Sequence, residues 1–326
     1  MAYFKSPRLY IAAPHDEVWL AEQAQAHVAA LAGQLPDAAA LREFSQRHGV
    51  ELATMMLYQA ILAAQPHAGF WQRLQALPAT AQQPAGQPTL AVVPAMLHAE
   101  HPEVGGDGAL PISIARRCGW QALVVPNQSR GSASTNARLL ADWLRDEAPD
   151  NTWLLTMSQG GVALRWALER HGADWSPHKV RGWLNVCSTV NGTSLARQML
   201  GSARQRTITR LLLALTGMDA DAIRELHPDH FSQAVQTPPH WQVINVVGLT
   251  LPAHLQKTSL ISRYQLLTAY GPNDGMVCFH ESLAPGLIVP VWATDHFFRN
   301  PAVAALLYRL LALLGRTGLE GSSWKP

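Results

Sequence analysis

The chain has 326 residues, of which 48% are hydrophobic and 15% are charged, and its formal net charge is +2 at pH 7. A chain this apolar buries most of its length in a compact fold, which excludes an intrinsically disordered protein. The near balance of charge and the absence of a long Lys/Arg run exclude a surface that follows a phosphate backbone, so no nucleic-acid partner is expected.

The cysteines and the first residues give further limits. Cys118, Cys187 and Cys278 are odd in number and far apart, so neither a disulfide framework nor a zinc site is expected. The first eight residues lack the basic start and apolar run of a secretory signal, and no segment reaches the ~18 consecutive apolar residues of a membrane span. We expect a cytoplasmic protein, and nothing in the sequence indicates its oligomeric state.

The first part of the chain, residues 1–85, is predicted to be a helical extension. Apolar residues recur at helical spacing through Val18–Leu35 and Leu52–Leu62. The extension ends in the segment Pro78–Pro88, whose prolines and glycine cannot continue a helix and favour an extended linker. This extension could form a dimer interface, a cap over a site or a dock for a carrier protein, and its residues do not decide among them.

Residues 86–326 have the pattern of an α/β domain. Short β-prone runs alternate with helical ones, which is typical of βαβ units around a mostly parallel central sheet flanked by helices. A crossover helix is predicted after the hydroxyl-rich segment 132–135. The predicted strands are Thr89–Val93, Ala122–Val125, Thr152–Met157, Val180–Val186, Gln242–Val247 and Leu287–Trp292.

A long helical segment of about residues 191–240 interrupts this alternation. An insertion of this length between two strands is typical of a lid, and its apolar residues favour an acyl or otherwise apolar substrate. The run Ser262–Tyr270 is too short for its periodicity to distinguish strand from helix.

The stretch from Thr152 to Trp166 indicates a nucleophile. A predicted strand leads directly into Ser158, Gly160 and Gly161 follow, and a helical pattern then begins. This is the pattern of a nucleophile elbow, in which a strained strand-to-helix turn exposes the serine hydroxyl. The usual motif has glycine two residues before the serine, where this chain has Thr156.

A serine at an elbow needs a histidine base, and that base needs a carboxylate to fix its tautomer. The turn Gly271–Met276 contains Asp274, and His296 follows the last predicted strand. Both lie after Ser158 in the order serine, acid, histidine. Asp295 is the rival acid, and it ranks second because neighbours along a chain seldom direct a carboxylate at the adjacent ring.

These segments resemble the α/β-hydrolase superfamily, and within it the lipases and esterases. The resemblance rests on Met-Ser-Gln-Gly-Gly at residues 157–161, the stretch 187–196, Pro-Asn-Asp-Gly at 272–275 and Asp-His-Phe at 295–297, and it covers about residues 89–310. It implies an α/β-hydrolase fold and an oxyanion hole built from two backbone N–H groups. The first maps to Gln159 and the second to Met96, with Leu97 as the alternative.

We therefore expect a serine carboxylic ester hydrolase. Its expected catalytic residues are Ser158, His296 and Asp274, and its expected substrate is a small-molecule or acyl ester. No cofactor is expected, since no phosphate cradle is present and the two histidines and three acids of residues 98–108 match no metal-ligand spacing. An acyltransferase or thioesterase would use the same three residues. A non-catalytic scaffold that binds a partner is the alternative of a different class.

Overall fold

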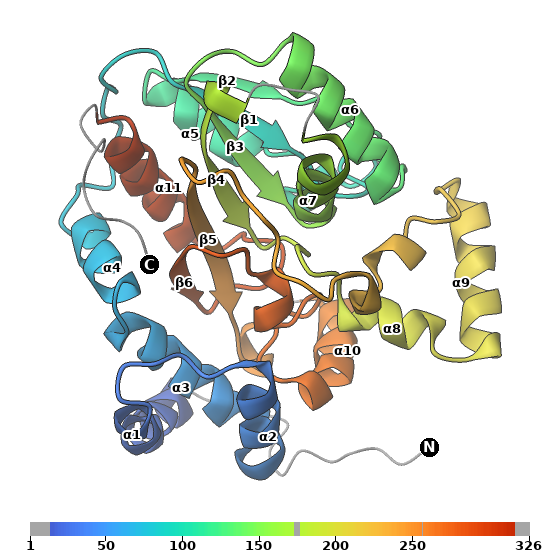
Figure 1. Ribbon diagram of the computed structural model, residues 1–326. Helices are drawn as coiled ribbons and strands as arrows, with labels where there is room; N and C mark the ends of the chain where they lie inside the picture. Colours follow the sequence, from blue (N-terminus) through green and yellow to red (C-terminus); the bar gives the residue numbers. More distant parts are fainter. Residues whose placement is uncertain (1–13, 173–176, 256, 317–326) are drawn as a thin grey trace.

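The computed structural model describes residues 14–172, 177–255 and 257–316 (Figure 1). The first thirteen residues, on which part of the prediction about a secretory signal rests, lie outside this range. The strands are β1 Thr89–Val93, β2 Gln121–Val124, β3 Thr152–Met157, β4 Val180–Val186, β5 Gln242–Leu249 and β6 Leu287–Trp292. The α-helices are α1 Pro14–Ala30, α2 Ala38–His48, α3 Val50–Ala63, α4 His67–Gln75, α5 Ala109–Arg117, α6 Ala133–Asp146, α7 Gln159–His171, α8 Ser194–Leu200, α9 Ala203–Thr216, α10 Thr258–Leu267 and α11 Pro301–Leu314.

The strands form one six-stranded sheet in the order β2-β1-β3-β4-β5-β6. Every neighbouring pair is parallel. This confirms the predicted sheet, and four of the six predicted strands have the predicted bounds, while β2 begins one residue earlier than predicted and β5 continues to Leu249. Parallel strands place all their carboxyl ends at one edge, so the loops after β1, β3, β4 and β6 meet there.

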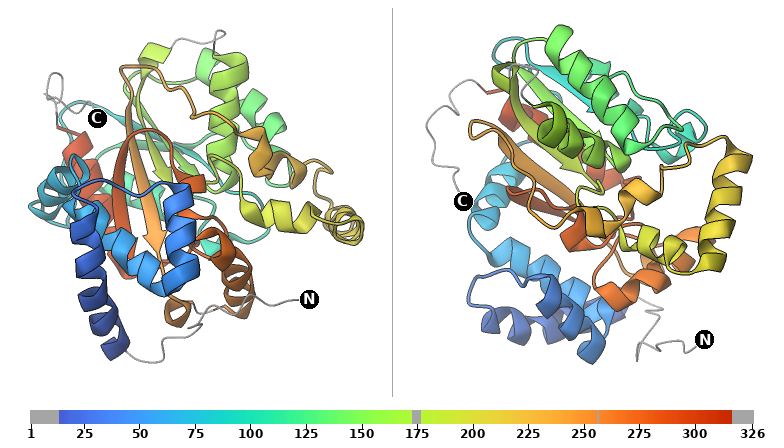
Figure 2. Two further views of the ribbon diagram at one scale, coloured as in Figure 1. Left: turned by 60° about the horizontal axis from the view of Figure 1, so that its bottom comes forward. Right: turned by 45° about the vertical axis from the view of Figure 1, so that its right-hand side comes forward.

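Helices cover both faces of the sheet, as the continuous hydrophobicity of its strands predicts (Figures 1 and 2). Leu90 and Val92 of β1 point into a core shared with α5 and α11. Ala91 and Val93, which alternate with them, point into a second core shared with α6 and α7. The predicted crossover helix is α6, whose first turn is capped by Ser132 through the backbone N–H of Thr135.

The N-terminal helices pack beside β6, at one edge of the sheet (Figure 1). The helices predicted over Val18–Leu35 and Leu52–Leu62 correspond to α1 and α3, but α1 ends at Ala30, because Ala32 and Gly33 adopt positive φ. Two further helices, α2 and α4, were not predicted. α2 buries only Leu41 and Ser45, so few large apolar residues mark it in the sequence.

The segment predicted as a linker, residues 78–88, contains no helix or strand. It passes the end of α11, where the Ala85 N–H donates to the Gly315 carbonyl at 2.7 Å.

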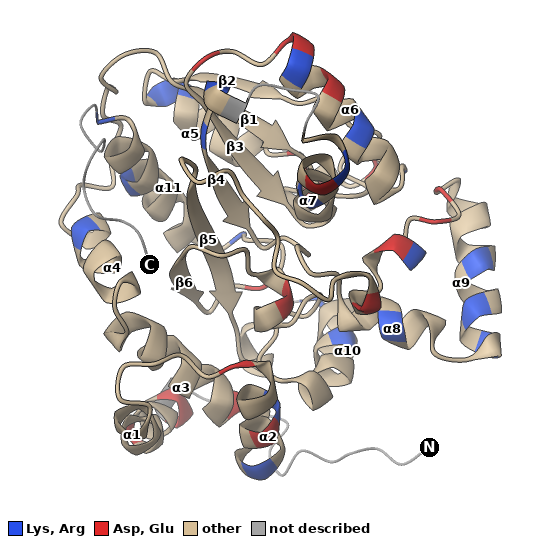
Figure 3. Ribbon diagram, viewed as in Figure 1, with Lys and Arg blue, Asp and Glu red and all other residues tan. Residues whose placement is uncertain are grey.

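The insertion of residues 191–240 is helical, as predicted, and contains α8 and α9. Figure 1 shows α9 standing away from the rest of the molecule, and Figure 3 shows that the charged residues of α9 are basic. It buries only Thr209 and Leu213 and exposes Ile208, Leu211, Leu212 and Leu215. The undecided run Ser262–Tyr270 is helical, since α10 covers most of it. Among the described residues, no helix is long and apolar enough to cross a membrane.

Candidate active site

Ser158 occupies a sharp turn between β3 and α7. β3 ends at Met157 and α7 begins at Gln159, so Ser158 is the only residue between them. Its φ of 49° and ψ of −122° are strained for a residue with a side chain. The glycines that follow allow close packing: a Cβ on Gly160 would lie 2.6 Å from the Val93 carbonyl oxygen, and one on Gly161 would lie 2.4 Å from the Ser188 Cβ.

Thr156 fits at the position where the elbow motif has glycine because its hydroxyl has buried polar partners. The Trp183 indole N–H donates to the Thr156 Oγ1 at 2.7 Å, and the Ser188 Oγ lies 2.9 Å away. Thr156 is itself fully buried. A buried hydroxyl without partners would destabilise the fold, and these two contacts avoid that cost.

His296 lies beside Ser158, with its Nε2 3.1 Å from the serine Oγ. The turn after β6 brings it there, helped by the positive φ of Ala293. A main-chain hydrogen bond fixes the turn: the His296 N–H donates to the Asp274 carbonyl at 3.0 Å. The ring is buried, with 6% of the residue exposed, so the surroundings hold it in one orientation.

Asp274 accepts from the other nitrogen of that ring, since its Oδ2 lies 2.9 Å from the His296 Nδ1. Its second oxygen, Oδ1, accepts the backbone N–H groups of Met276 and Val277, each at 2.9 Å. The carboxylate is therefore held on both oxygens in a buried turn. The three residues predicted for catalysis form one hydrogen-bonded series, Ser158–His296–Asp274.

The rival acid, Asp295, has a different partner. Its Oδ1 accepts the Phe297 backbone N–H at 3.0 Å. Burial raises the pKa of Asp295 above its ordinary value. Between the two acids, the geometry favours Asp274 as the partner of His296.

The two backbone N–H groups proposed for the oxyanion hole, those of Met96 and Gln159, lie just after β1 and β3. Within the described parts of the chain, no hydrogen bond occupies the N–H of Met96 or that of Gln159. The N–H of Leu97, the alternative donor, is directed elsewhere and donates to the Ser129 carbonyl at 2.8 Å. The Gln159 side chain is anchored through its Nε2, which donates to the Gly131 carbonyl.

A cavity of about 290 Å³, which we call the serine cavity, opens at Ser158 and His296. Its other lining residues come from four separate loops, from α10 and from the end of β3: Ala95, Met96, Leu97, His101, Val104, Gly106, Met157, Cys187, Arg263, Met276 and Phe297. No residue of the helical insertion is among them, so in this structure α8 and α9 do not cover the serine.

The histidine-rich loop of residues 98–108 forms one wall of the serine cavity through His101, Val104 and Gly106. Its histidines contact groups within the same loop region: the His98 Nδ1 lies 2.9 Å from the Ala95 carbonyl, and the His101 Nδ1 lies 3.3 Å from the Glu103 carboxylate.

Sequence reasoning missed Cys187, Arg263 and Met276 as parts of this cavity. Cys187 follows β4 at the carboxyl edge of the sheet, a position that could have indicated it. Burial raises the pKa of its thiol well above the ordinary value, and the nearby Asp274 carboxylate raises it further, so it remains an unreactive wall. Arg263 lies on α10, and nothing in its sequence surroundings pointed to the site; its Nη1 lies 3.2 Å from the Met276 sulfur.

No protein-family model matches the sequence, and no curated protein matches it. Solved structures do resemble it. A metagenomic carboxyl esterase, MGS0156, is 17% identical with a TM-score of 0.56, over 73% of this chain and 79% of that protein. The lipase BlEst2 of Bacillus licheniformis in its mature form is 19% identical with a TM-score of 0.55, over 72% of this chain and 96% of that one.

The propeptide form of the same lipase is 18% identical with a TM-score of 0.55, and the match covers 54% of its length. At these identities the likeness concerns the fold. The parallel sheet with helices on both faces and the serine turn after β3 agree with it, and the chain has the α/β-hydrolase fold.

Proposed function

We propose that this chain is a serine hydrolase that cleaves carboxylic esters through an acyl-enzyme intermediate. The observation that carries the proposal is the hydrogen-bonded series from the Ser158 hydroxyl through the His296 ring to the Asp274 carboxylate. Ser158 is on a turn that exposes its hydroxyl, and the serine cavity opens at Ser158 and His296. This combination is typical of nucleophilic catalysis.

In the acylation step, the Ser158 Oγ attacks the ester carbonyl carbon while the His296 Nε2 takes its proton. Asp274 keeps the ring proton on Nδ1, which leaves Nε2 free to accept, and its charge stabilises the imidazolium that forms. The N–H groups of Gln159 and Met96 stabilise the negative oxygen of the tetrahedral intermediate. His296 then protonates the departing alcohol, and the acyl group remains on Ser158.

In the second step, His296 takes a proton from water, and the resulting hydroxide attacks the acyl carbon. The Ser158 oxygen leaves with the proton from His296, and a carboxylic acid is released. The positive end of α7 faces the serine, and it favours the negative charge in both tetrahedral intermediates.

An acyltransferase or a thioesterase would share the first step and differ in the acceptor or the leaving group. Hydrolysis needs no acceptor besides water, so it is the simpler proposal.

The test is labelling with a fluorophosphonate, which reacts with activated serines, followed by hydrolysis of p-nitrophenyl esters from acetate to decanoate. We expect the wild type to label and to release p-nitrophenol, and Ser158→Ala to do neither. Ser262→Ala, which removes an exposed hydroxyl from α10, is the matched control and should behave like the wild type.

The outcomes separate the alternatives. A wild type that neither labels nor hydrolyses any of the esters would support a non-catalytic scaffold. Labelling with no ester hydrolysis, but turnover of acyl thioesters, would favour the thioesterase. A product formed only when a second alcohol is added would favour acyl transfer.

A further inference from the structure

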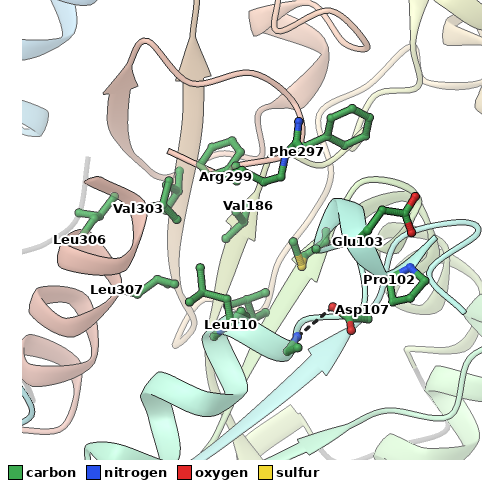
Figure 4. A pocket seen from close by; sticks show the side chains of 17 residues that line it. Pro102, Glu103, Asp107, Leu110, Val186, Phe297, Arg299, Val303, Leu306 and Leu307 are labelled. Carbon is green, nitrogen blue, oxygen red and sulfur yellow. Dashed lines mark hydrogen bonds between the residues drawn. The ribbon is translucent and has the colours of Figure 1, made fainter. Parts of the chain in front are cut away.

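A second cavity, of about 340 Å³, lies directly beside the serine cavity (Figure 4). Its floor is the face of the sheet that α5 and α11 cover. Met157, Val186 and Val246 stand in register across β3, β4 and β5 and form a row along this floor. Figure 4 shows Val303, Leu306 and Leu307 projecting from α11 on one side, with Pro102, Glu103 and Asp107 on the other. We call it the α11 cavity.

The wall between the two cavities includes residues next to the catalytic ones. Met157 and Phe297 line both cavities, and they directly precede Ser158 and directly follow His296. The remainder of the wall is the loop 101–107, in which Gly105 faces the α11 cavity and Gly106 faces the serine cavity. Met157 and Phe297 are therefore the side chains that an alkyl chain attached at the Ser158 oxygen would pass on its way into the α11 cavity.

The interior of the α11 cavity is apolar and mostly aliphatic, with Phe298 also buried in its lining. Leu155, Val186, Val246, Val303, Leu306 and Leu307 are each at most 6% exposed and carry no polar side-chain atom. Met157 is unbranched, and a methionine adapts its side chain to a neighbouring group more easily than a branched residue does.

The charged residues of the α11 cavity lie at its outer rim. Glu103 and Arg299 are exposed there, and the Asp107 Oδ1 accepts the Ala109 backbone N–H at the start of α5. The rim therefore carries both signs of charge, and one of its two acids already caps a helix. This arrangement favours an uncharged, hydrocarbon occupant over an ion.

We propose that the α11 cavity binds the aliphatic chain of the acyl group while its carbonyl is held at Ser158. This inference rests on the proposed function, since it assigns the chain-length preference of that reaction. The serine cavity holds the reacting carbonyl and the first carbons of the chain, and the following methylenes pass Met157 and Phe297 and pack against α11. Each methylene buried there improves binding about fourfold.

The proposal is tested by filling the α11 cavity with Leu307→Trp and, as a second variant, Val303→Phe. Either side chain takes the space of two to three methylenes, so the ratio of kcat/KM for p-nitrophenyl decanoate over acetate should fall at least ~10-fold. Ala302→Trp places the same bulk on the exposed side of α11 and should leave this ratio within twofold of the wild type. Circular dichroism establishes that each variant is folded.

A binding measurement separates this proposal from the proposed function. In the Ser158→Ala background, Leu307→Trp should weaken binding of p-nitrophenyl decanoate at least ~10-fold, whether or not the wild type hydrolyses esters. If that loss is found without any Ser158-dependent hydrolysis, the cavity assignment stands and the proposed function fails.

If hydrolysis depends on Ser158 but two folded filling variants change neither the ratio nor the binding, the proposed function stands and the cavity assignment fails. A crystal structure of the wild type labelled with dodecyl fluorophosphonate gives a third readout. The alkyl chain should lie between Val186 and Leu307, and a chain that lies over the molecular surface instead would overturn the proposal.

Discussion

Asp274→Asn tests the orientation of the proposed base, because the structure determines which way the new amide must face. The Asp274 Oδ1 accepts two backbone N–H groups, from Met276 and Val277. In the variant, the amide oxygen has to take this position, since an NH₂ group there would face two donors. The NH₂ group then points at the His296 Nδ1, where Oδ2 now accepts.

The consequence is a reversed tautomer. The His296 Nδ1 becomes an acceptor, and its proton moves to Nε2, which faces the Ser158 hydroxyl and can no longer take its proton. The same substitution lowers kcat about 10⁴-fold in a Ser-His-Asp protease. We expect a loss of about 10³–10⁴-fold here, which corresponds to about 4–5.5 kcal/mol of transition-state stabilisation.

The assay is kcat for p-nitrophenyl acetate, together with the rate of fluorophosphonate labelling, and both should fall together. Asp295→Asn is the matched control, because it neutralises the adjacent acid, whose Oδ1 accepts the Phe297 N–H. We expect it to change kcat less than about threefold. The reasoning is refuted if Asp274→Asn keeps more than a tenth of the wild-type kcat, or if Asp295→Asn causes the larger loss.

Two predictions concern stability. Gly160→Ala should lower the free energy of unfolding, measured with urea, by about 1–3 kcal/mol, because the new Cβ would lie 2.6 Å from the Val93 carbonyl oxygen. A change below about 0.5 kcal/mol would show that the turn adapts to the added methyl group. His67 accepts the backbone N–H of Ile288 through its Nδ1, and burial lowers its pKa below the ordinary value. Its contribution is therefore fully present above about pH 6.5 and is lost as the pH falls below that value. The difference in the free energy of unfolding between the wild type and His67→Gln should therefore decrease as the pH is lowered from 7.5 to 5.5. The decrease should be smaller than the limit of about 1.4 kcal/mol per pH unit, because solvent reaches part of the ring. An increase over this range would contradict the expected direction of the pKa shift.

Much of the fold could be predicted from local sequence because its strands, apart from β2, are buried on both faces. Thr152–Met157 and Val180–Val186 are mostly buried and carry large apolar residues on both faces, and turn residues bound them, so their ends are visible in the sequence. The helices at the surface carry a weaker signal. α5 is only nine residues long and has Pro111 in its first turn, and α11 is apolar around most of its circumference, so the sequence marks neither as clearly as it marks the strands.

The proposed catalytic residues could be chosen from the sequence because each follows a strand or a turn in a known order. Their neighbours could not be chosen in this way. Arg263 and Met276 reach the serine cavity through α10 and the Asp274 turn, and their proximity depends on how these segments pack. The α11 cavity likewise exists only because a helix near the end of the chain stands off the sheet between β3 and β5.

The N-terminal helices also affect whether the edge of this sheet can pair with strands of other molecules. β6 is an edge strand, and an edge strand with open main-chain groups is a template for strands of another chain. Here the Ile288 N–H is occupied by His67 of α4, and Pro290, which faces the same side two residues later, has no N–H to offer. A chain shortened to begin after the linker would lose the first of these two protections. The resistance of this edge to intermolecular pairing thus depends in part on a helix that takes no part in the proposed chemistry.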